Sequence, residues 1–473
     1  HVAGGKRTHL TELVPHPVHN ELHDLPTPPT PYGTAGWLEA DKALLVYDRF
    51  DIWAVDPESA LPPTCVTDGV GRGKGLRFRV NRLDFEKDTI GPDDSLLLSF
   101  LVDATKAQGF ARDKVRGTNP PEILIQGDES FGPVRKAELA DVVMLTRSSF
   151  QKFPDLWAGP LDFKGLKPIS DANPQQTEYL WGTSELVRWT SLNGDPLQGI
   201  LFKPEGFDAK KPYPMIVYFY ERNSDNLNRY VVPAAGSSSI NFSFYVSRGY
   251  LVFVPDIPYR VGAPGQSAVN AILPGVARLV DQGFVDPKRI GVQGHSWGGY
   301  QVAYLVTQSN LFACAEAGAP VANMTSAYGG IRWSTGVSRM FQYERTQSRI
   351  GATLWNAQQH YVENSPIFWA DRIETPLLIL HNDHDGAVPW YQGIELFVAL
   401  RRLGKPSWLL NYNGEDHGLT KAQNRKDFAV RMQQFFDHYL KGAAAPVWLE
   451  RGVPAIDKGK SLGLELVAPG SQP

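Results

Sequence analysis

The chain has 473 residues and a mass of 52.5 kDa, which is enough for two or three domains. Its 47 basic and 50 acidic side chains give a formal charge of −3, so no basic excess exists to hold a nucleic acid. With 42% hydrophobic and 21% charged residues, the composition is that of a folded protein rather than a disordered one. No apolar run approaches the ~20 residues of a membrane-spanning helix, and we expect no membrane span.

From residue 1 to about 180 the sequence reads as short strands separated by turns. A proline-rich stretch, Leu25–Pro31, precedes them and is typical of a connector. The candidate strands are Lys42–Tyr47, Asp51–Val55, Ser95–Leu101, Glu122–Gln126 and Asp141–Thr146. This pattern fits an irregular β domain or a run of propeller blades, and at ~40–50 residues per blade three or four blades would fit.

A glycine-rich segment, Gly69–Gly75, lies within this region and resembles a phosphate-binding loop. Lys74 is followed by glycine rather than by serine or threonine, and the four-residue spacer of that motif is missing. We therefore expect a turn here. The two cysteines, Cys65 and Cys314, cannot form a disulfide framework and are expected to be unpaired.

Around Leu186 the pattern changes to alternating strands and helices. A hairpin over Arg188–Lys203 is indicated by the turn signal Asn193-Gly194. The expected strands after it are Met215–Tyr220, Leu251–Val254, Ile290–Gln293, Pro376–Leu380 and Ser407–Asn411. The expected helices are Pro274–Gln282, Gly298–Thr307, Trp390–Leu403 and Lys426–Lys441. This alternation predicts a parallel sheet covered by helices on both faces.

The segment Ile290–Tyr300 carries the motif that matters most for chemistry. A strand runs into Gly294-His295-Ser296-Trp297-Gly298 and directly out into a helix, which is the setting of a nucleophile elbow. The glycines permit a turn too sharp for a β-carbon beside the nucleophile. The helix amino end offers backbone N–H groups to developing negative charge. We therefore predict that Ser296 is a nucleophile.

A serine nucleophile needs a base and an orienting acid, which in this arrangement follow it in the order acid, then histidine. The strand Leu377–Leu380 ends in a segment where Asp383 and Asp385 compete for the acid role. Farther on, His417 lies on a loop after another strand. His438 falls within the last predicted helix and is expected at the surface.

The segment His381–Asp385 also permits a metal-binding interpretation, since two histidines and two aspartates occupy five positions. Neighbouring residues at a strand end point in alternating directions, and no calcium-loop pattern is completed. We therefore predict no metal and no other cofactor.

With these motifs the chain resembles the prolyl oligopeptidase family of serine peptidases, in particular its dipeptidyl-peptidase and acylaminoacyl-peptidase branches. The resemblance covers about residues 185 to 442, through Gly294–Tyr300, Asp385–Pro389 and Glu415–Gly418. It implies acyl transfer from short peptides, with Ser296 as nucleophile and His417 as base. The family's acid stands in an Asp-x-x-Val pattern, which selects Asp385.

The same resemblance implies an oxyanion hole and a substrate pocket. The hole would combine the Trp297 N–H with the hydroxyl of Tyr220, for which core packing is the alternative role. The pocket would be lined by Trp297, Val321, Met324, Tyr328 and Val388, with ordinary core packing as the alternative for Met324 and Tyr328. Dipeptidyl peptidases carry aromatic residues where this chain has Met324 and Ala327, so a preference for proline is not implied.

The resemblance also predicts the domain organisation, namely an α/β-hydrolase catalytic domain preceded by part of a β-propeller. We expect residues 1–184 to form the C-terminal blades of a propeller, 185–442 the catalytic domain and 443–473 a tail. Family propellers have seven or eight blades, so the missing ones would have been cut away or belong to a second chain that stays associated. A homo-oligomer is also possible in this scheme.

Two rival functions remain open at this point. The same three residues could cleave esters or lipids, as in esterase- and lipase-type α/β-hydrolases. A catalytically idle propeller–hydrolase scaffold is the second rival. Exopeptidase and endopeptidase action are not distinguished. The chain begins at His1 without an initiator methionine, so we expect a removed amino terminus, and export to the periplasm or beyond is favoured over a cytoplasmic location.

Overall fold

The computed structural model describes residues 8–117 and 119–467. The opening residues His1–Gly5, which bear on the prediction of a removed terminus, lie outside this range. The chain forms two compact units. Unit 1 contains residues 1–23, 28–178 and 225–230, and unit 2 contains residues 24–27, 179–224 and 231–473.

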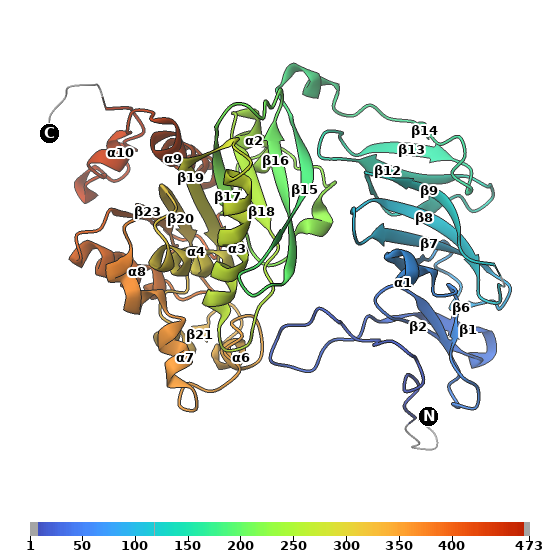
Figure 1. The fold of residues 1–473 in the computed structure, drawn as a ribbon. Helices are drawn as coiled ribbons and strands as arrows, with labels where there is room; N and C mark the ends of the chain where they lie inside the picture. The colour runs from blue at the N-terminus through green and yellow to red at the C-terminus, as the bar shows by residue number, and fades with distance from the viewer. Residues whose placement is uncertain (1–7, 118, 468–473) are drawn as a thin grey trace. The chain divides into compact units, whose positions relative to one another are not determined.

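Unit 1 is built from three small, mainly antiparallel sheets (Figure 1). Their strand orders are β4-β3-β2-β1-β6, β5-β7-β8-β9 and β10-β12-β13-β14, with β11 paired to β12. The bounds are β1 Thr34–Leu38, β2 Leu44–Tyr47, β3 Ile52–Val55, β4 Thr64–Cys65, β5 Leu76–Asn81, β6 Thr89–Ile90, β7 Ser95–Val102, β8 Gln108–Lys114, β9 Glu122–Gly127, β10 Ser130–Phe131, β11 Arg135–Lys136, β12 Val143–Ser148, β13 Asp155–Gly159 and β14 Lys167–Pro168.

The middle sheet of unit 1 contributes to hydrophobic clusters on both of its faces. Leu96, Leu98 and Phe100 of β7 belong to one cluster, and Leu97 belongs to another. Successive side chains of a strand point to opposite faces, so an apolar run can serve two interfaces. Sheets of four or five strands stacked in this way are part of a β-propeller.

The glycine-rich segment of unit 1 differs from the prediction of a turn. It forms a short helix, α1 Val70–Lys74, bounded by Gly69 and Gly75 with φ of 70° and 66°. The carboxylate of Asp51 accepts hydrogen bonds from the backbone N–H of Gly71 and Arg72, each at 2.8 Å. A side-chain carboxylate thus occupies the helix amino end that a phosphate would need.

Unit 2 contains one large sheet with strand order β15-β16-β18-β17-β19-β20-β23-β24 (Figure 1). The pairs from β18 to β24 are parallel, and β15 and β16 add an antiparallel hairpin at one edge. The strand bounds are β15 Gly182–Thr190, β16 Pro196–Pro204, β17 Tyr213–Tyr218, β18 Leu251–Pro255, β19 Val285–His295, β20 Cys314–Gly318, β23 Leu377–Leu380 and β24 Ser407–Leu410, and a small ribbon pairs β21 Ile331–Arg332 with β22 Val337–Ser338.

Helices cover both faces of this sheet, as the alternation of strands and helices predicted. Helices α3 and α4 pack together on one face, and α2 and α9 on the other (Figure 1). The helix bounds are α2 Phe242–Ser247, α3 Pro264–Val280, α4 Trp297–Gln308, α5 Met324–Tyr328, α6 Met340–Glu344, α7 Gln358–Glu363, α8 Tyr391–Arg402, α9 Ala422–Lys441 and α10 Val447–Glu450. This is the α/β-hydrolase fold expected from the sequence.

The start of α3 differs from the prediction. The sequence placed a helix start at Pro274, but α3 begins at Pro264 and carries Pro274 inside it. Proline has no N–H to donate to the carbonyl four residues earlier, which belongs to Asn270. That carbonyl instead accepts a hydrogen bond from Leu192 N at 3.0 Å, in the turn of the β15–β16 hairpin. The hairpin thus replaces the missing helical bond.

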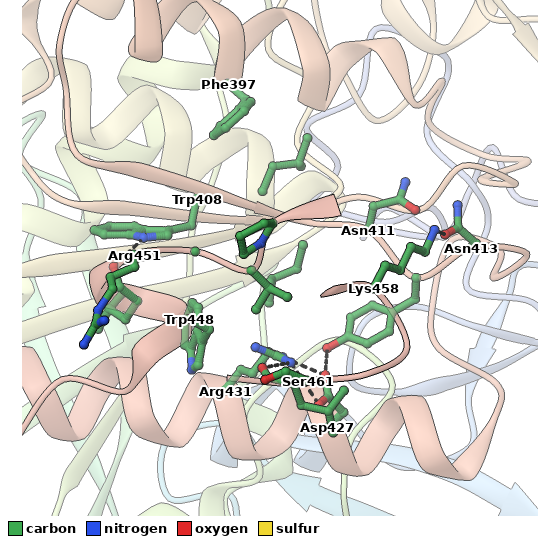
Figure 2. A pocket seen from close by; sticks show the side chains of 18 of the residues that line it. Phe397, Trp408, Asn411, Asn413, Asp427, Arg431, Trp448, Arg451, Lys458 and Ser461 are labelled. Atoms are coloured by element: carbon green, nitrogen blue, oxygen red, sulfur yellow. Dashed lines mark hydrogen bonds and ion pairs between the residues drawn. The ribbon is translucent and has the colours of Figure 1, made fainter. Parts of the chain in front are cut away.

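The residues after 442 pack against the end of the sheet beside β24. The indole N–H of Trp448 donates to Gln434 Oε1 at 2.7 Å, and that of Trp408 donates to the Leu449 carbonyl at 2.9 Å. A hollow of about 1060 Å³ lies between β24, α9 and this segment, with Asp427 and Arg431 paired on its wall (Figure 2). Its lining contains none of the predicted catalytic residues.

Candidate active site

Ser296 stands at the junction of β19 and α4 with φ of 60° and ψ of −114°. A positive φ is strained for a residue with a β-carbon and is kept only where the surroundings enforce it. Here the Ser296 N–H donates to the Gly318 carbonyl of β20 at 2.8 Å. The backbone conformation is that of a nucleophile elbow.

The glycines of this turn are required by close backbone approaches. A β-carbon on Gly294 would lie 2.6 Å from the Gly298 carbonyl, and one on Gly298 would lie 2.6 Å from the Phe219 carbonyl. One on Gly299 would lie 2.1 Å from the Gly318 carbonyl. No side chain can be accommodated at such distances without moving the backbone.

Asp385 follows β23 and is almost fully buried, with 3% of its surface exposed. Its Oδ1 accepts from the backbone N–H of Ala387 at 2.9 Å and of Val388 at 2.8 Å. Its Oδ2 lies 2.7 Å from His417 Nδ1 and 3.3 Å from His381 Nε2. Burial raises the pKa of this carboxyl, but the two histidines outweigh it and hold the pKa below its usual range, so Asp385 is ionised at neutral pH.

The competing aspartate, Asp383, is turned to other partners. Its carboxylate accepts from Asn413 Nδ2 at 2.7 Å and from Gly414 N at 2.8 Å. It makes no hydrogen bond with His417 in the described part of the chain. The geometry therefore favours Asp385 as the group that orients the imidazole.

The His417 imidazole lies beside the elbow. Its ring centre is 4.7 Å from that of His295, the residue before Ser296. In residues 8–117 and 119–467, no hydrogen bond joins the Ser296 hydroxyl to His417, although catalytic hydrogen bonds often form only when a substrate is bound. Burial lowers the pKa of His295 to about 3, so this neighbour stays neutral beside the imidazole.

Two acidic residues hold the loop that carries His417. Asp416 Oδ1 accepts from His417 N at 2.7 Å and from Gly386 N at 2.8 Å, which ties this loop to the Asp385 loop. Glu415 accepts four hydrogen bonds, from Thr420 N and Oγ1, Lys421 N and Asn424 Nδ2. Burial raises the pKa of Glu415, but these bonds outweigh it and bring the pKa to about 2.

Tyr220 lies next to the elbow on the loop after β17. Its ring carbon Cδ2 would be 3.8 Å from a β-carbon on Gly298. Its carbonyl accepts from Gln301 Nε2 at 2.7 Å and from the Tyr259 hydroxyl at 3.0 Å, and its own hydroxyl accepts from Gln347 Nε2 at 3.0 Å. The Tyr220 ring thus lies near the amino end of α4, where the Trp297 N–H is also found, and its hydroxyl is held by Gln347.

The five residues predicted to line the substrate pocket belong to one cluster of buried side chains, namely Trp297, Val321, Met324, Tyr328 and Val388. The Trp297 ring stacks on Tyr300 with ring centres 4.6 Å apart, and its indole N–H donates to the Tyr259 hydroxyl at 3.1 Å. Such contacts are also those of a packed core. The assignment of these residues to a pocket stays a prediction.

The metal-binding interpretation finds no geometric support in the structure. Within the described residues, no group of three or more His, Cys, Asp or Glu side chains is arranged to hold a metal ion. His381 instead contacts Asp385 and the Val388 carbonyl, the latter at 3.1 Å. No helix of the described chain has the length and apolarity needed to cross a bilayer.

Several residues of this site had no role assigned from the sequence. Asp416 stands within the recognised loop motif, so a bridging role could have been suspected from its position. Gln347 and Tyr259 lie in segments without a motif and reach Tyr220 only through the fold. His381 was noticed, but as a candidate metal ligand rather than as a second hydrogen-bond donor to Asp385.

Comparison with known proteins agrees with this geometry. Residues 237–443, which include Ser296, Asp385 and His417, match the model of the prolyl oligopeptidase family. Residues 237–443 thus carry a prolyl oligopeptidase family domain. The chain is 26% identical over 329 residues to the uncharacterized peptidase YuxL of Bacillus subtilis, with 66% of this chain and 47% of the relative covered.

Two further proteins similar to this chain bear names that state an activity. Dipeptidyl-peptidase 5 of Porphyromonas endodontalis is 26% identical over 276 residues, which cover 54% of this chain and 37% of the relative. The crystal structure of Porphyromonas gingivalis dipeptidyl peptidase 4 superposes with a TM-score of 0.64 at 17% identity, covering 86% of this chain and 56% of the other. The chain thus spans about half the length, or less, of the curated relatives it matches.

Proposed function

We propose that this chain is a serine peptidase that hydrolyses short peptides. The observation that carries the proposal is the strained backbone of Ser296 beside a His417–Asp385 pair joined at 2.7 Å. The match of residues 237–443 to the prolyl oligopeptidase family supports peptides rather than other acyl compounds as substrates.

In the proposed mechanism the Ser296 hydroxyl attacks the peptide carbonyl while His417 Nε2 takes its proton. Asp385 holds Nδ1 in the protonated tautomer and stabilises the imidazolium that forms. His417 then returns the proton to the leaving amine, which departs and leaves an acyl-enzyme. Water, activated by the same histidine, attacks this ester and releases the acid.

The negative charge on the carbonyl oxygen would be received by two donors, the Trp297 N–H and the Tyr220 hydroxyl. Tyr220 accepts a hydrogen bond from Gln347, which leaves its own hydrogen free to point at the oxyanion. The helix dipole of α4 adds to this stabilisation because Trp297 is its first residue.

We also propose that the three sheets of unit 1 are propeller blades completed by further blades, either upstream in a longer chain or in a second chain. The proposal is supported by the relatives, of which this chain covers about half or less. The proposed domains are residues 1–184, 185–442 and 443–473, and a homo-oligomer is a further proposal. Size-exclusion chromatography with light scattering tests both forms of association.

The experiment that tests the activity compares peptidyl-nitroanilides with short-chain nitrophenyl esters. We expect both to be cleaved, since an ester is the easier acyl donor, and we expect the Ser296→Ala variant to lose both activities. Cleavage of esters alone, over a series of uncharged and charged peptides, would contradict the peptidase proposal and favour an esterase. No cleavage of either would favour an idle scaffold.

A further inference from the structure

Gln293 is a buried polar side chain on the strand that leads into the nucleophile elbow, and sequence analysis gave it no role. It lies on β19, three residues before Ser296, and 0% of its surface is exposed. A buried amide is costly unless its donors and its acceptor are all hydrogen-bonded. The partners of Gln293 therefore show which parts of the molecule it holds together.

The amide of Gln293 makes two hydrogen bonds to the segment 236–240. Its Nε2 donates to the Ser238 carbonyl at 3.1 Å, and its Oε1 accepts from the Ile240 N–H at 3.3 Å. Ser238 and Ile240 are themselves buried, although this segment forms neither a helix nor a strand. A donor and an acceptor on one planar group thus fix two backbone positions of the segment.

The same segment holds the loop of the proposed base. The Ser237 carbonyl accepts from the Leu419 N–H at 2.9 Å, and Leu419 lies two residues after His417. Leu419 is also buried. Two hydrogen bonds joined by one stretch of backbone therefore connect the strand of the nucleophile, through Gln293, to the loop of the base.

Glu316 on the neighbouring strand orients the amide. Gln293 and Glu316 stand opposite each other on β19 and β20, and Gln293 Nε2 donates to Glu316 Oε2 at 2.7 Å. This bond requires the amide nitrogen on that side, so the amide oxygen is directed to Ile240. Burial raises the pKa of Glu316 to about 8, so the side chain is largely neutral at pH 7 and brings little charge into the core.

We propose that Gln293 is a positioning residue that sets the place of His417 relative to Ser296, with Glu316 fixing the orientation of its amide. The proposal rests on the proposed serine peptidase function, in which His417 takes the proton of the Ser296 hydroxyl. Gln293 acts on the reaction only through the segment 236–240 and the loop of the base. A fully bonded polar network specifies one arrangement of these parts, and a displacement of about 1 Å can cost about 100-fold in rate.

The first variant is Gln293→Met, which keeps a side chain of similar length and removes the amide. We expect kcat on a peptide substrate to fall by about 10- to 100-fold while KM stays within about twofold, because the base moves and the peptide-binding surface does not. The rate at which a fluorophosphonate labels Ser296 should fall by a similar factor, since this reaction needs an activated serine.

Two variants of Glu316 decide the matter even if Gln293→Met fails to fold. Glu316→Gln keeps an oxygen for Gln293 Nε2 and matches the neutral acid in shape, so kcat should stay near the wild-type value. Glu316→Leu removes that oxygen and lets the amide turn over. We therefore expect kcat to fall by about 3- to 10-fold, the factor that corresponds to one hydrogen bond.

The matched control is Tyr245→Phe, which removes another buried oxygen from the neighbourhood of Glu316. The Tyr245 hydroxyl has no hydrogen-bond partner in the part of the chain that the structure describes, and it lies close enough to Glu316 for the two to interact electrostatically. Its loss should leave kcat and the labelling rate unchanged. A fall in Tyr245→Phe equal to that in Glu316→Leu would indicate a general disturbance of the core and overturn the proposal.

The remaining outcomes separate this proposal from the proposed function. A merely structural role would lower Tm in the variants but leave kcat and the labelling rate of the folded proteins near wild type, which would overturn it. Equal kcat in Glu316→Leu and Glu316→Gln, or a rise in KM with kcat unchanged, would do the same. If the wild type is labelled at Ser296 but cleaves no peptide, the peptidase function fails and the labelling rates still decide. A wild type that is neither active nor labelled would overturn both.

Discussion

Ser296 is held by the close packing of backbone atoms, whereas Asp385 and His417 are held by hydrogen bonds between side chains and loops. Around the serine, three glycines allow approaches that no β-carbon would permit. Around the acid and base, Asp416 ties the His417 loop to the Asp385 loop, and the Glu415 carboxylate accepts hydrogen bonds within the His417 loop. The stability of the elbow around Ser296 should therefore respond to added side-chain volume. The hydrogen-bonded loops that carry Asp385 and His417 should respond to changes of charge and pH.

The largest loss of kcat is expected from replacing the proposed acid, Asp385. Asp385→Asn should lower kcat by about 10⁴-fold, because the amide can present an N–H to His417 Nδ1 and hold the wrong tautomer. Asp383→Asn is the matched control and should change kcat little, since Asp383 bonds Asn413 and Gly414 instead. A greater loss in Asp383→Asn than in Asp385→Asn would transfer the acid role to Asp383.

The next largest loss of kcat is expected from removing one oxyanion donor. Tyr220→Phe should lower kcat about 10²- to 10³-fold with much less change in KM, because the donor acts on charge that develops during reaction. Tyr218→Phe removes a hydroxyl two residues earlier on β17 and should leave kcat near its wild-type value. Steady-state kinetics on one peptide substrate measures both. An unchanged kcat in Tyr220→Phe would exclude this hydroxyl from the hole.

A single added methyl group tests whether the elbow around Ser296 depends on close backbone packing. In Gly298→Ala the new β-carbon would meet the Phe219 carbonyl at 2.6 Å, so we expect a loss of about 1–3 kcal/mol in unfolding free energy. Gly73→Ala, in α1, places its β-carbon where no atom lies within 4 Å and is the control. Chemical denaturation compares the two. Equal stability of both variants would mean that the elbow tolerates a β-carbon.

The smallest effect is expected from Glu415→Gln and should depend on pH. The folded pKa of Glu415, about 2, lies below its unfolded value, so the carboxylate stabilises the fold above the unfolded pKa of ~4.3. This contribution is lost as pH falls from there towards 2. Near pH 6 we expect Tm of Glu415→Gln to lie about 2–4 °C below wild type. By pH 3 the gap should shrink, and a gap independent of pH would contradict the pKa assignment.

The elbow around Ser296 and the loops of the acid and base also differ in how much of them the sequence predicted. The elbow is continuous in sequence, so Gly294–Gly298 revealed both the nucleophile and its backbone. For the acid, Asp383 and Asp385 could be separated only through the family pattern, because the choice depends on which way each side chain turns at the end of β23. Gln347 lies on a segment without a motif, and only the fold brings it to Tyr220.

The fold was predicted where local signals are strong and missed where tertiary contacts decide. The Asn193-Gly194 turn and the strands around it stand as expected, since that turn signal is local. The strand β20, Cys314–Gly318, was not predicted, because its short run of small residues has weak strand propensity and is stabilised by pairing with β19 and β23. The true start of α3 was missed because Pro274 indicates a helix start, whereas it lies inside the helix and the Asn270 carbonyl accepts from Leu192 N instead.

The most direct test of the account is to locate a fluorophosphonate adduct by peptide mass spectrometry in wild type and in His417→Ala. Such a reagent reacts with a serine whose hydroxyl is activated by a base. We predict one modified serine in the wild type, at position 296, and labelling slowed by at least about 10³-fold in His417→Ala. Labelling of a different serine, or labelling of Ser296 at the wild-type rate without His417, would contradict the joint action of Ser296, His417 and Asp385.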